Sequence, residues 1–136
     1  MKNIKALGEI ALRVNDIPGM TAFYEDVVGL EVMRREENMT FFRIAEGYAG
    51  HTQILAFFDR SSADDYIGID SAKTTIDHFA FTIQLEDLEQ EQARLESLGI
   101  AVDTAVHLWV KWRSLFFSDP EGNRIEFVCY DESIES

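Results

Sequence analysis

The sequence predicts an α+β fold in which a βαβββ module occurs twice and forms a cupped mixed sheet. Two segments with alternating apolar residues, EIALRV (9–14) and HFAFTI (78–83), begin 69 positions apart (78 − 9). A helical pattern and three more strand patterns follow each of them. The repeat predicts a single domain over residues 1–136, with module one at 1–60, a polar connector at 61–75 and module two at 76–136.

The alternation within these two segments assigns residues to opposite faces of a sheet. In the first segment Ile10, Leu12 and Val14 share the face expected to meet the core. Because each module has only one helix, the other face of each sheet stays uncovered, and two such faces would line a shared trough. The residues expected in the trough are Glu9, Ala11, Arg13, His78, Ala80 and Thr82.

Each helical pattern has a start signal and a stop signal. NDIPGMTAFYEDVVGL offers Asn15 or Asp16 as an N-cap, Pro18 in the first turn and Gly29 as the stop. QLEDLEQEQARLESLGI has acidic residues in its opening turn and ends at Gly99. The stripe predicted to be buried on the second helix consists of Leu88, Leu95 and Leu98.

The remaining strand candidates complete the two modules. They are LEVMRRE, MTFFRIA and TQILAFFD in module one, and IAVDTAV, RSLFFS and NRIEFVC in module two. Between the last two, DPEGN has proline and glycine placed for a turn. In NRIEFVC the apolar Ile125 and Phe127 share one face, so that Glu126 points to the other.

Charge and composition exclude several classes of partner. The chain has 25 acidic and 12 basic residues, a net charge of −13, which repels nucleic acid phosphates. No apolar run reaches the ~18 residues of a membrane span, and charges interrupt the N-terminus before a secretory core forms, so we expect a cytoplasmic protein. Cys129, the only cysteine, permits no intrachain disulfide and no cysteine-based zinc site. The tail, CYDESIES, reads as an acidic, solvated end.

Four features resemble one family across nearly the whole chain. They are EIALRVNDIPGMTAFYEDVVGLEV at the start, DHFAFTI opening the second module, WRSLFFSDPEGNRIEF closing it, and the duplicated βαβββ order. In these features the chain is similar to the vicinal oxygen chelate superfamily, also called the glyoxalase, bleomycin resistance protein and extradiol dioxygenase group. The resemblance implies this fold, which hosts many different chemistries.

The resemblance also implies a divalent metal ion in the trough. Its ligands would be Glu9, His78 and Glu126, at the family's positions on the first strand of each module and the last strand of the second. One histidine and two carboxylates suit Mn²⁺, Fe²⁺, Ni²⁺ or Zn²⁺. Glyoxalase I enzymes use a fourth ligand on the last strand of module one, where this chain has Ile54 or Leu55, so the standard glyoxalase reaction is not expected.

The same side chains have an alternative without metal. His78 would then be satisfied by Asp77 or by a backbone carbonyl, and the two carboxylates would pair with Arg13 and Arg124. Two carboxylates that converge in a partly dry trough, however, repel each other unless a cation lies between them. That repulsion, together with the family positions, favours the metal.

Two functions follow as hypotheses. The first is a metal-dependent lyase, isomerase or dioxygenase of this superfamily, acting on a small substrate with two neighbouring oxygens and forming a homodimer. Glu126 and His107 are the catalytic candidates. Arg13, Trp109 and Trp112 are the candidate substrate contacts. The alternative is a metal-free protein that sequesters a cationic small molecule, as bleomycin resistance proteins do, which the acidic charge would favour.

Overall fold

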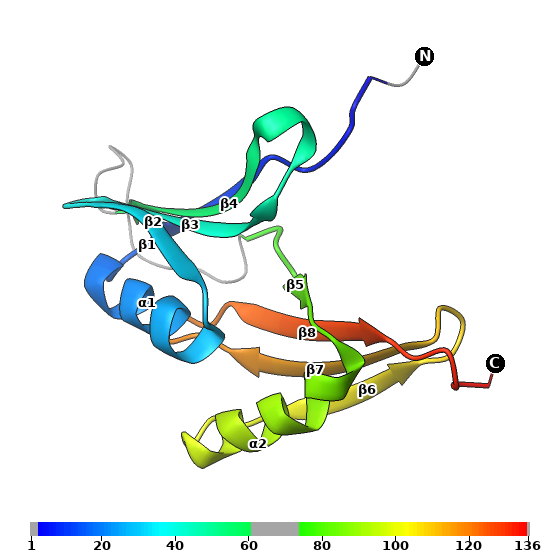
Figure 1. Ribbon diagram of the computed structural model, residues 1–136. Coiled ribbons are helices and arrows are strands. Elements are labelled where there is room, and N and C mark those ends of the chain that lie inside the picture. The colour runs from blue at the N-terminus through cyan, green and yellow to red at the C-terminus, as the bar shows by residue number, and fades with distance from the viewer. Residues whose placement is uncertain (1–2, 61–73, 136) are drawn as a thin grey trace. The chain divides into compact units, whose positions relative to one another are not determined.

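The computed structural model describes residues 3–60 and 74–135 (Figure 1). By its internal contacts the chain divides into two compact units, Met1–Ile69 and Asp70–Ser136. Apart from residues 74 and 75, the connector predicted at 61–75 lies outside the described residues. Each unit is a sheet with one main helix.

The first unit is a four-stranded mixed sheet. Its strand order is β1-β4-β3-β2, with β1 parallel to β4 and the other pairs antiparallel. Helix α1 lies along one face of this sheet (Figure 1). The elements are β1 (Glu9–Val14), α1 (Ile17–Phe23) continued by a π-turn (Tyr24–Val28), β2 (Glu31–Glu36), β3 (Met39–Glu46), a 3₁₀ turn (Tyr48–Gly50) and β4 (Thr52–Asp59).

Local signals in the sequence set both ends of α1. Asp16 is the N-cap, and its Oδ1 accepts a hydrogen bond from the Gly19 N–H at 3.0 Å. The helical segment ends at Gly29, whose φ of 91° is left-handed and therefore favours glycine. Between these ends the fully buried ring of Tyr24 packs on Phe42 and Phe57, which joins helix to sheet.

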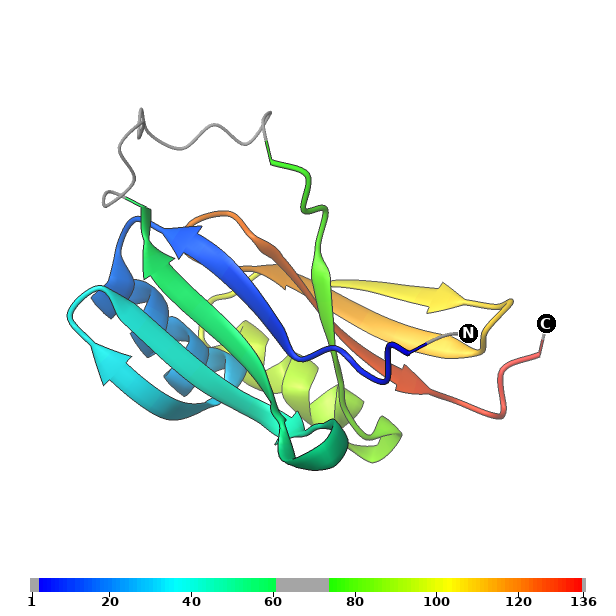
Figure 2. The ribbon, with the colours of Figure 1, turned by 90° about the horizontal axis from the view of Figure 1, so that it is seen from above.

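The second unit repeats this topology. Its strand order is β5-β8-β7-β6, with β5 parallel to β8 and the other pairs antiparallel (Figure 2). The predicted pair of βαβββ modules is therefore confirmed. The elements are β5 (Phe79–Thr82), a 3₁₀ turn (Leu85–Asp87), α2 (Leu88–Ser97), β6 (Asp103–His107), β7 (Trp112–Ser118) and β8 (Arg124–Tyr130). Among the described residues, no helix has the length and apolar character needed to cross a bilayer.

The predicted DPEGN turn connects β7 to β8. Both carboxylate oxygens of Asp119 accept hydrogen bonds: Oδ1 from the backbone N–H groups of Glu121 and Asn123, and Oδ2 from the Asn123 side chain. Gly122 has a left-handed φ of 86° in this turn. The turn sets the register of β8, because Phe117 pairs with Ile125 directly beyond it.

Leu98 is an exception to the predicted buried stripe on the second helix. Leu95 is fully buried, but Leu98 is 54% exposed. Helix α2 ends at Ser97, and Leu98 as the C-cap has φ −85° and ψ 2°, so the helical repeat no longer aims its side chain at the core. The helix thus contributes one fully buried leucine.

The C-terminal tail is also less solvated than its acidic sequence suggested. Asp131 is 7% exposed and Ile134 is 6% exposed. The Asp131 carboxylate accepts hydrogen bonds from the Ser133 hydroxyl at 2.6 Å and from Arg113 Nε at 2.6 Å. The tail therefore folds back onto β7 through a buried, fully bonded carboxylate.

We predict that Leu95→Ala lowers the free energy of unfolding by about 2–5 kcal/mol, because it empties a fully buried site. Leu98→Ala removes the same side chain from an exposed position and is expected to change this free energy by less than about 0.5 kcal/mol. Urea unfolding of the two variants provides the measurement. Equal losses would place Leu98 in the core after all.

Asp131 is expected to make stability depend on pH in the acid range. The Ser133 hydroxyl, and then Arg113, lower the pKa of Asp131 from 3.8 to about 2. The stability from this carboxylate is therefore present above pH 4 and is lost as the pH falls towards 2. In melting curves between pH 2 and 5, Asp131→Asn should flatten this dependence. An unchanged slope in the variant would contradict the assignment.

Candidate functional site

One face of the second sheet carries a cluster of polar side chains. Strand β8 alternates, with Ile125 and Phe127 buried in the core and Glu126 on the other face. The register places Glu126 opposite Phe116 on β7 and Ala80 on β5. Glu126 is nevertheless only 6% exposed, so its carboxylate lies within the surface formed by its neighbours.

Glu126 is the centre of this cluster because both of its carboxylate oxygens have partners. Oε1 lies 3.1 Å from His78 Nε2. Oε2 accepts a hydrogen bond from the Ser114 hydroxyl at 2.5 Å and lies 3.9 Å from His107 Nε2. Three strands, β6, β7 and β8, contribute to the cluster, together with His78, the residue before β5.

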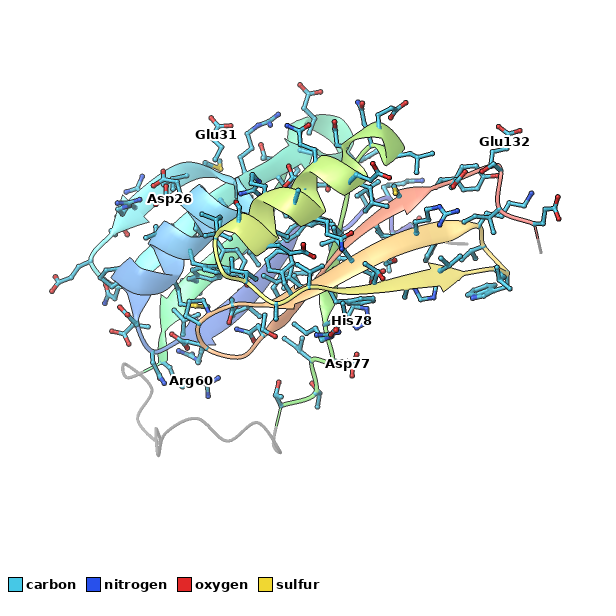
Figure 3. All side chains as sticks on the ribbon, turned by 90° about the horizontal axis from the view of Figure 1, so that it is seen from below. Asp26, Glu31, Arg60, Asp77, His78 and Glu132 are labelled. Carbon is cyan, nitrogen blue, oxygen red and sulfur yellow. The ribbon has the colours of Figure 1, made fainter. Side chains whose placement is uncertain are left out.

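Asp77 orients the ring of His78. The two side chains lie side by side where the chain enters β5 (Figure 3), with Asp77 Oδ2 2.7 Å from His78 Nδ1. Nδ1 donates to this carboxylate, so that Nε2 faces Glu126 Oε1, to which it donates a hydrogen bond in the metal-free chain and beside which its lone pair could bind a cation. The alternative in which His78 pairs with Asp77 is thus partly right, but the second ring nitrogen, Nε2, also contacts Glu126.

Aromatic and charged groups form one side of the cluster. The Phe116 ring meets the His78 ring edge to face, with centroids 5.8 Å apart. The Arg124 guanidinium lies over the Phe116 ring, 4.8 Å from its centroid, and pairs with Asp103 at 3.0 Å. The sequence alternative that paired Arg124 with Glu126 is wrong, because the arginine reaches across to β6.

The geometry of His78 and Glu126 fits two ligands of one divalent ion. Ligand atoms about 2.1 Å from an ion lie about 3.0–3.5 Å apart when their bonds meet at 90–110°. The Nε2 to Oε1 separation of 3.1 Å falls in this range. In the described ranges, no three His, Cys, Asp or Glu side chains gather closely enough to hold a metal. The pair would therefore need a further ligand.

Cys129 does not supply a ligand on this face. It follows the core alternation of β8 and is 1% exposed. Burial, and to a lesser extent the neighbouring charge of Asp131, raise the pKa of the Cys129 thiol, which keeps it protonated.

Glu9 lies on the open face of the first unit. It begins β1, is exposed, and pairs in register with Ile54, which in turn pairs with Arg43. Leu55 points to the core and is 1% exposed. The place opposite Glu9 is therefore Ile54, which has no atom able to bind a metal.

Arg13 lines a pocket on the same face as Glu9. The pocket has a volume of about 480 Å³ and is lined by Ala11, Leu12, Arg13, Glu36, Asn38, Met39 and Phe58. Glu36 is already paired with Arg34 at 2.8 Å. Arg13 and Asn38 thus offer hydrogen-bond donors above an apolar floor.

The two tryptophans lie at the end of the second sheet beside the cluster. Trp112 pairs in register with His107 and is 42% exposed, while Trp109 is 84% exposed. Their ring centroids are 6.5 Å apart. Lys111 has a left-handed φ of 60° in the turn that joins β6 to β7.

Ser114 was not expected from the sequence. Alternation in RSLFFS assigns Ser114 and Phe116 to one face, but only the pairing of β7 with β8 brings its hydroxyl to Glu126. A serine within an apolar strand was the available signal.

Comparisons with known proteins agree with the sequence resemblance. The family model of the Glyoxalase/Bleomycin resistance protein/Dioxygenase superfamily matches residues 6–127. Glutathione transferase FosA of Serratia marcescens is 24% identical over 90% of this chain and 79% of its own length. Metallothiol transferase FosB of Bacillus licheniformis is 27% identical over 93% of this chain and 77% of its own length.

Solved structures share the fold. The crystal structure of lactoylglutathione lyase from Agrobacterium tumefaciens superposes with a TM-score of 0.69 at 29% identity, covering 94% of this chain and 96% of the lyase. The predicted fold class is thus confirmed independently of the strand assignment. Lyase chemistry was among the expected reactions, whereas group transfer, the reaction named for FosA and FosB, was not.

Proposed function

This chain belongs to the Glyoxalase/Bleomycin resistance protein/Dioxygenase superfamily, and we propose that it acts there as a metal-dependent enzyme on a small substrate with two neighbouring oxygen atoms. The prediction that the chain is an enzyme is confirmed, because the relatives named above are enzymes: two transferases and a lyase. The observation that carries the proposal is the Glu126 carboxylate, which is buried on the sheet face away from the core and lies 3.1 Å from His78 Nε2.

His78, Glu126 and Glu9 are the proposed metal ligands. His78 and Glu126 have the separation of neighbouring ligands, and Asp77 fixes the ring nitrogen that faces the carboxylate. Glu9 begins β1 and lies on the open face of its own sheet, at the family's position for the third ligand. Glu9 would complete the set from the same chain or from a second copy.

Two carboxylates and one neutral imidazole would formally neutralise a divalent ion. Such a ligand set favours hard ions, with Mn²⁺ first among the candidates and Fe²⁺, Ni²⁺ and Zn²⁺ after it. A bound ion supplies Lewis acidity, which stabilises negative charge as it develops on a substrate oxygen. The protein would contribute the orientation of substrate and the transfer of protons.

His107 is the proposed proton carrier. Its Nε2 lies 3.9 Å from Glu126 Oε2, beyond the distance of a good hydrogen bond, and its side chain is 36% exposed. The imidazole is therefore free to contact a substrate that binds on this face. There it would exchange a proton with that substrate. Glu126 is the second catalytic candidate, through the same carboxylate that binds the ion.

Arg13, Trp109 and Trp112 are the proposed substrate contacts. The pocket at Arg13 and Asn38 suits a carboxylate, and glutathione, named in FosA and in the lyase, carries carboxylates. The exposed tryptophans suit an apolar part of the substrate. The resemblance puts the fourth ligand of glyoxalase I at Ile54 or Leu55, neither of which can bind a metal, so we favour transferase chemistry, or a lyase reaction other than the standard glyoxalase one.

The competing hypothesis is a metal-free binding protein for a cationic molecule. The net charge of −13 favours it, since an amine could pair with Glu126 or Glu9 in place of a metal. Under this hypothesis cationic drugs raise the melting temperature and divalent ions do not.

We predict that protein purified without chelator contains a divalent ion, and that His78→Ala and Glu126→Gln both lose it. His107→Ala should retain the ion, because His107 is proposed to carry protons rather than to bind metal. His51→Ala is the histidine control, since His51 is not a proposed ligand; it follows the 3₁₀ turn at Tyr48–Gly50 and its ring lies against Gly8. Elemental analysis of the folded variants is the measurement.

Two outcomes of this experiment contradict the proposal. Metal-free wild-type protein that is stabilised by cationic drugs supports the binding protein instead. Loss of the ion from His107→Ala makes His107 a ligand and removes it as the free proton carrier.

We also propose a homodimer, on the basis of the family. Light scattering should give about 31 kDa, twice the chain mass of 15.5 kDa. Mixing Glu9→Gln with His78→Ala then locates the site. If ligands come from two chains, subunit exchange restores metal binding at about a quarter of the sites. No recovery assigns the site to one chain, and a mass of 15.5 kDa contradicts the dimer.

A further inference from the structure

Ser114 is the buried hydroxyl in the polar cluster. It lies in the middle of β7, is 2% exposed, and its Oγ donates to Glu126 Oε2 at 2.5 Å. Its register neighbours on the flanking strands are Ala105 and Val128, neither of which has a polar side-chain atom. The carboxylate is therefore the partner that the sheet offers to this hydroxyl.

The hydrogen bond makes the two oxygens of Glu126 unequal. An ionised carboxylate only accepts, so the serine hydroxyl must be the donor. Its single proton engages Oε2, the oxygen that also lies towards His107. Oε1 is left facing His78 Nε2 at 3.1 Å. A carboxylate held in this way cannot rotate without losing the buried bond to Ser114.

We propose that Ser114 is a positioning residue that orients Glu126 so that Oε1, and not Oε2, binds the divalent ion beside His78. This inference rests on the metal site proposed above and adds to it a residue outside the ligand set. Ser114 itself touches neither the ion nor the substrate. Its effect passes entirely through the carboxylate, as is typical of groups that bind metal ligands from behind.

The position of Ser114 also separates metal binding, at Oε1, from proton transfer with His107, at Oε2. Oε2, the oxygen nearest His107, accepts the hydrogen bond from Ser114. The negative charge on this oxygen is therefore less available to the ion. The ion then has one defined carboxylate oxygen and the His78 nitrogen on this sheet. Loss of the hydroxyl would let both oxygens compete for the ion, and the buried Oε2 would lack its partner.

Titration with Mn²⁺ tests this proposal. In isothermal calorimetry, Ser114→Ala is expected to bind Mn²⁺ about 10- to 100-fold more weakly than the wild-type protein. Ser114→Thr keeps the hydroxyl and should bind within about threefold of the wild type. Ser114→Val has the shape of the threonine variant without its hydroxyl, and should be weakened as the alanine variant is.

The threonine and valine variants separate positioning from packing. If Ser114 acted only by filling space, these two would bind Mn²⁺ equally, and the proposal would be overturned. Ser118→Ala, at the exposed end of the same strand, is the control and should leave the affinity unchanged. Melting of the metal-free variants verifies that each is folded before titration.

The same titration distinguishes failure of the proposed metal site from failure of the proposed role of Ser114. Wild-type protein that binds no Mn²⁺, Fe²⁺, Ni²⁺ or Zn²⁺ overturns the proposed metal site and this inference with it. Wild-type protein that binds Mn²⁺, with Ser114→Ala and Ser114→Val equally tight, overturns only the role of Ser114.

Discussion

The buried carboxylate of Glu126 is the constraint on which the site depends. A carboxylate at 6% exposure is costly unless hydrogen bonds or opposite charge compensate for lost water. Here Ser114 and His78 provide the compensation, one on each oxygen. Ser114 lies on β7 and His78 directly precedes β5, the two strands that flank β8, so the sheet itself assembles the group. An apolar residue at this place would pack more cheaply, which makes the retained charge an indication of function.

The surrounding structure supports this face of the second sheet from several sides. Leu115, Phe117, Ile125 and Phe127 pack on the side of the sheet that faces the core, and the turn at Asp119 fixes the register of β7 against β8. On the opposite side, the pairing of Arg124 with Asp103 and its contact with Phe116 support the His78 ring. Arg124, which is two residues from Glu126 in the sequence, is thereby paired elsewhere. The carboxylate remains available to a cation.

The first unit has the same design with a different surface. Glu9 and Arg13 lie on one face of β1, and Arg13 lines a pocket there. A duplicated module allows each copy to carry a different set of polar side chains on the same scaffold. This division is consistent with a superfamily in which transferases and lyases share one architecture.

The sequence by itself determined the two modules, their helix ends and the face of each strand, because these depend on local periodicity and on capping residues such as Asp16 and Gly29. It also placed Glu126 and His78 on a face away from the core. It could not place Leu98 or Asp131, since a helix end and a folded tail depend on contacts distant in the chain. Only the tertiary structure brought Ser114 to Glu126 and Arg124 to Asp103, because strand register, which pairs residues 12 and 21 positions apart, is not contained in either strand alone.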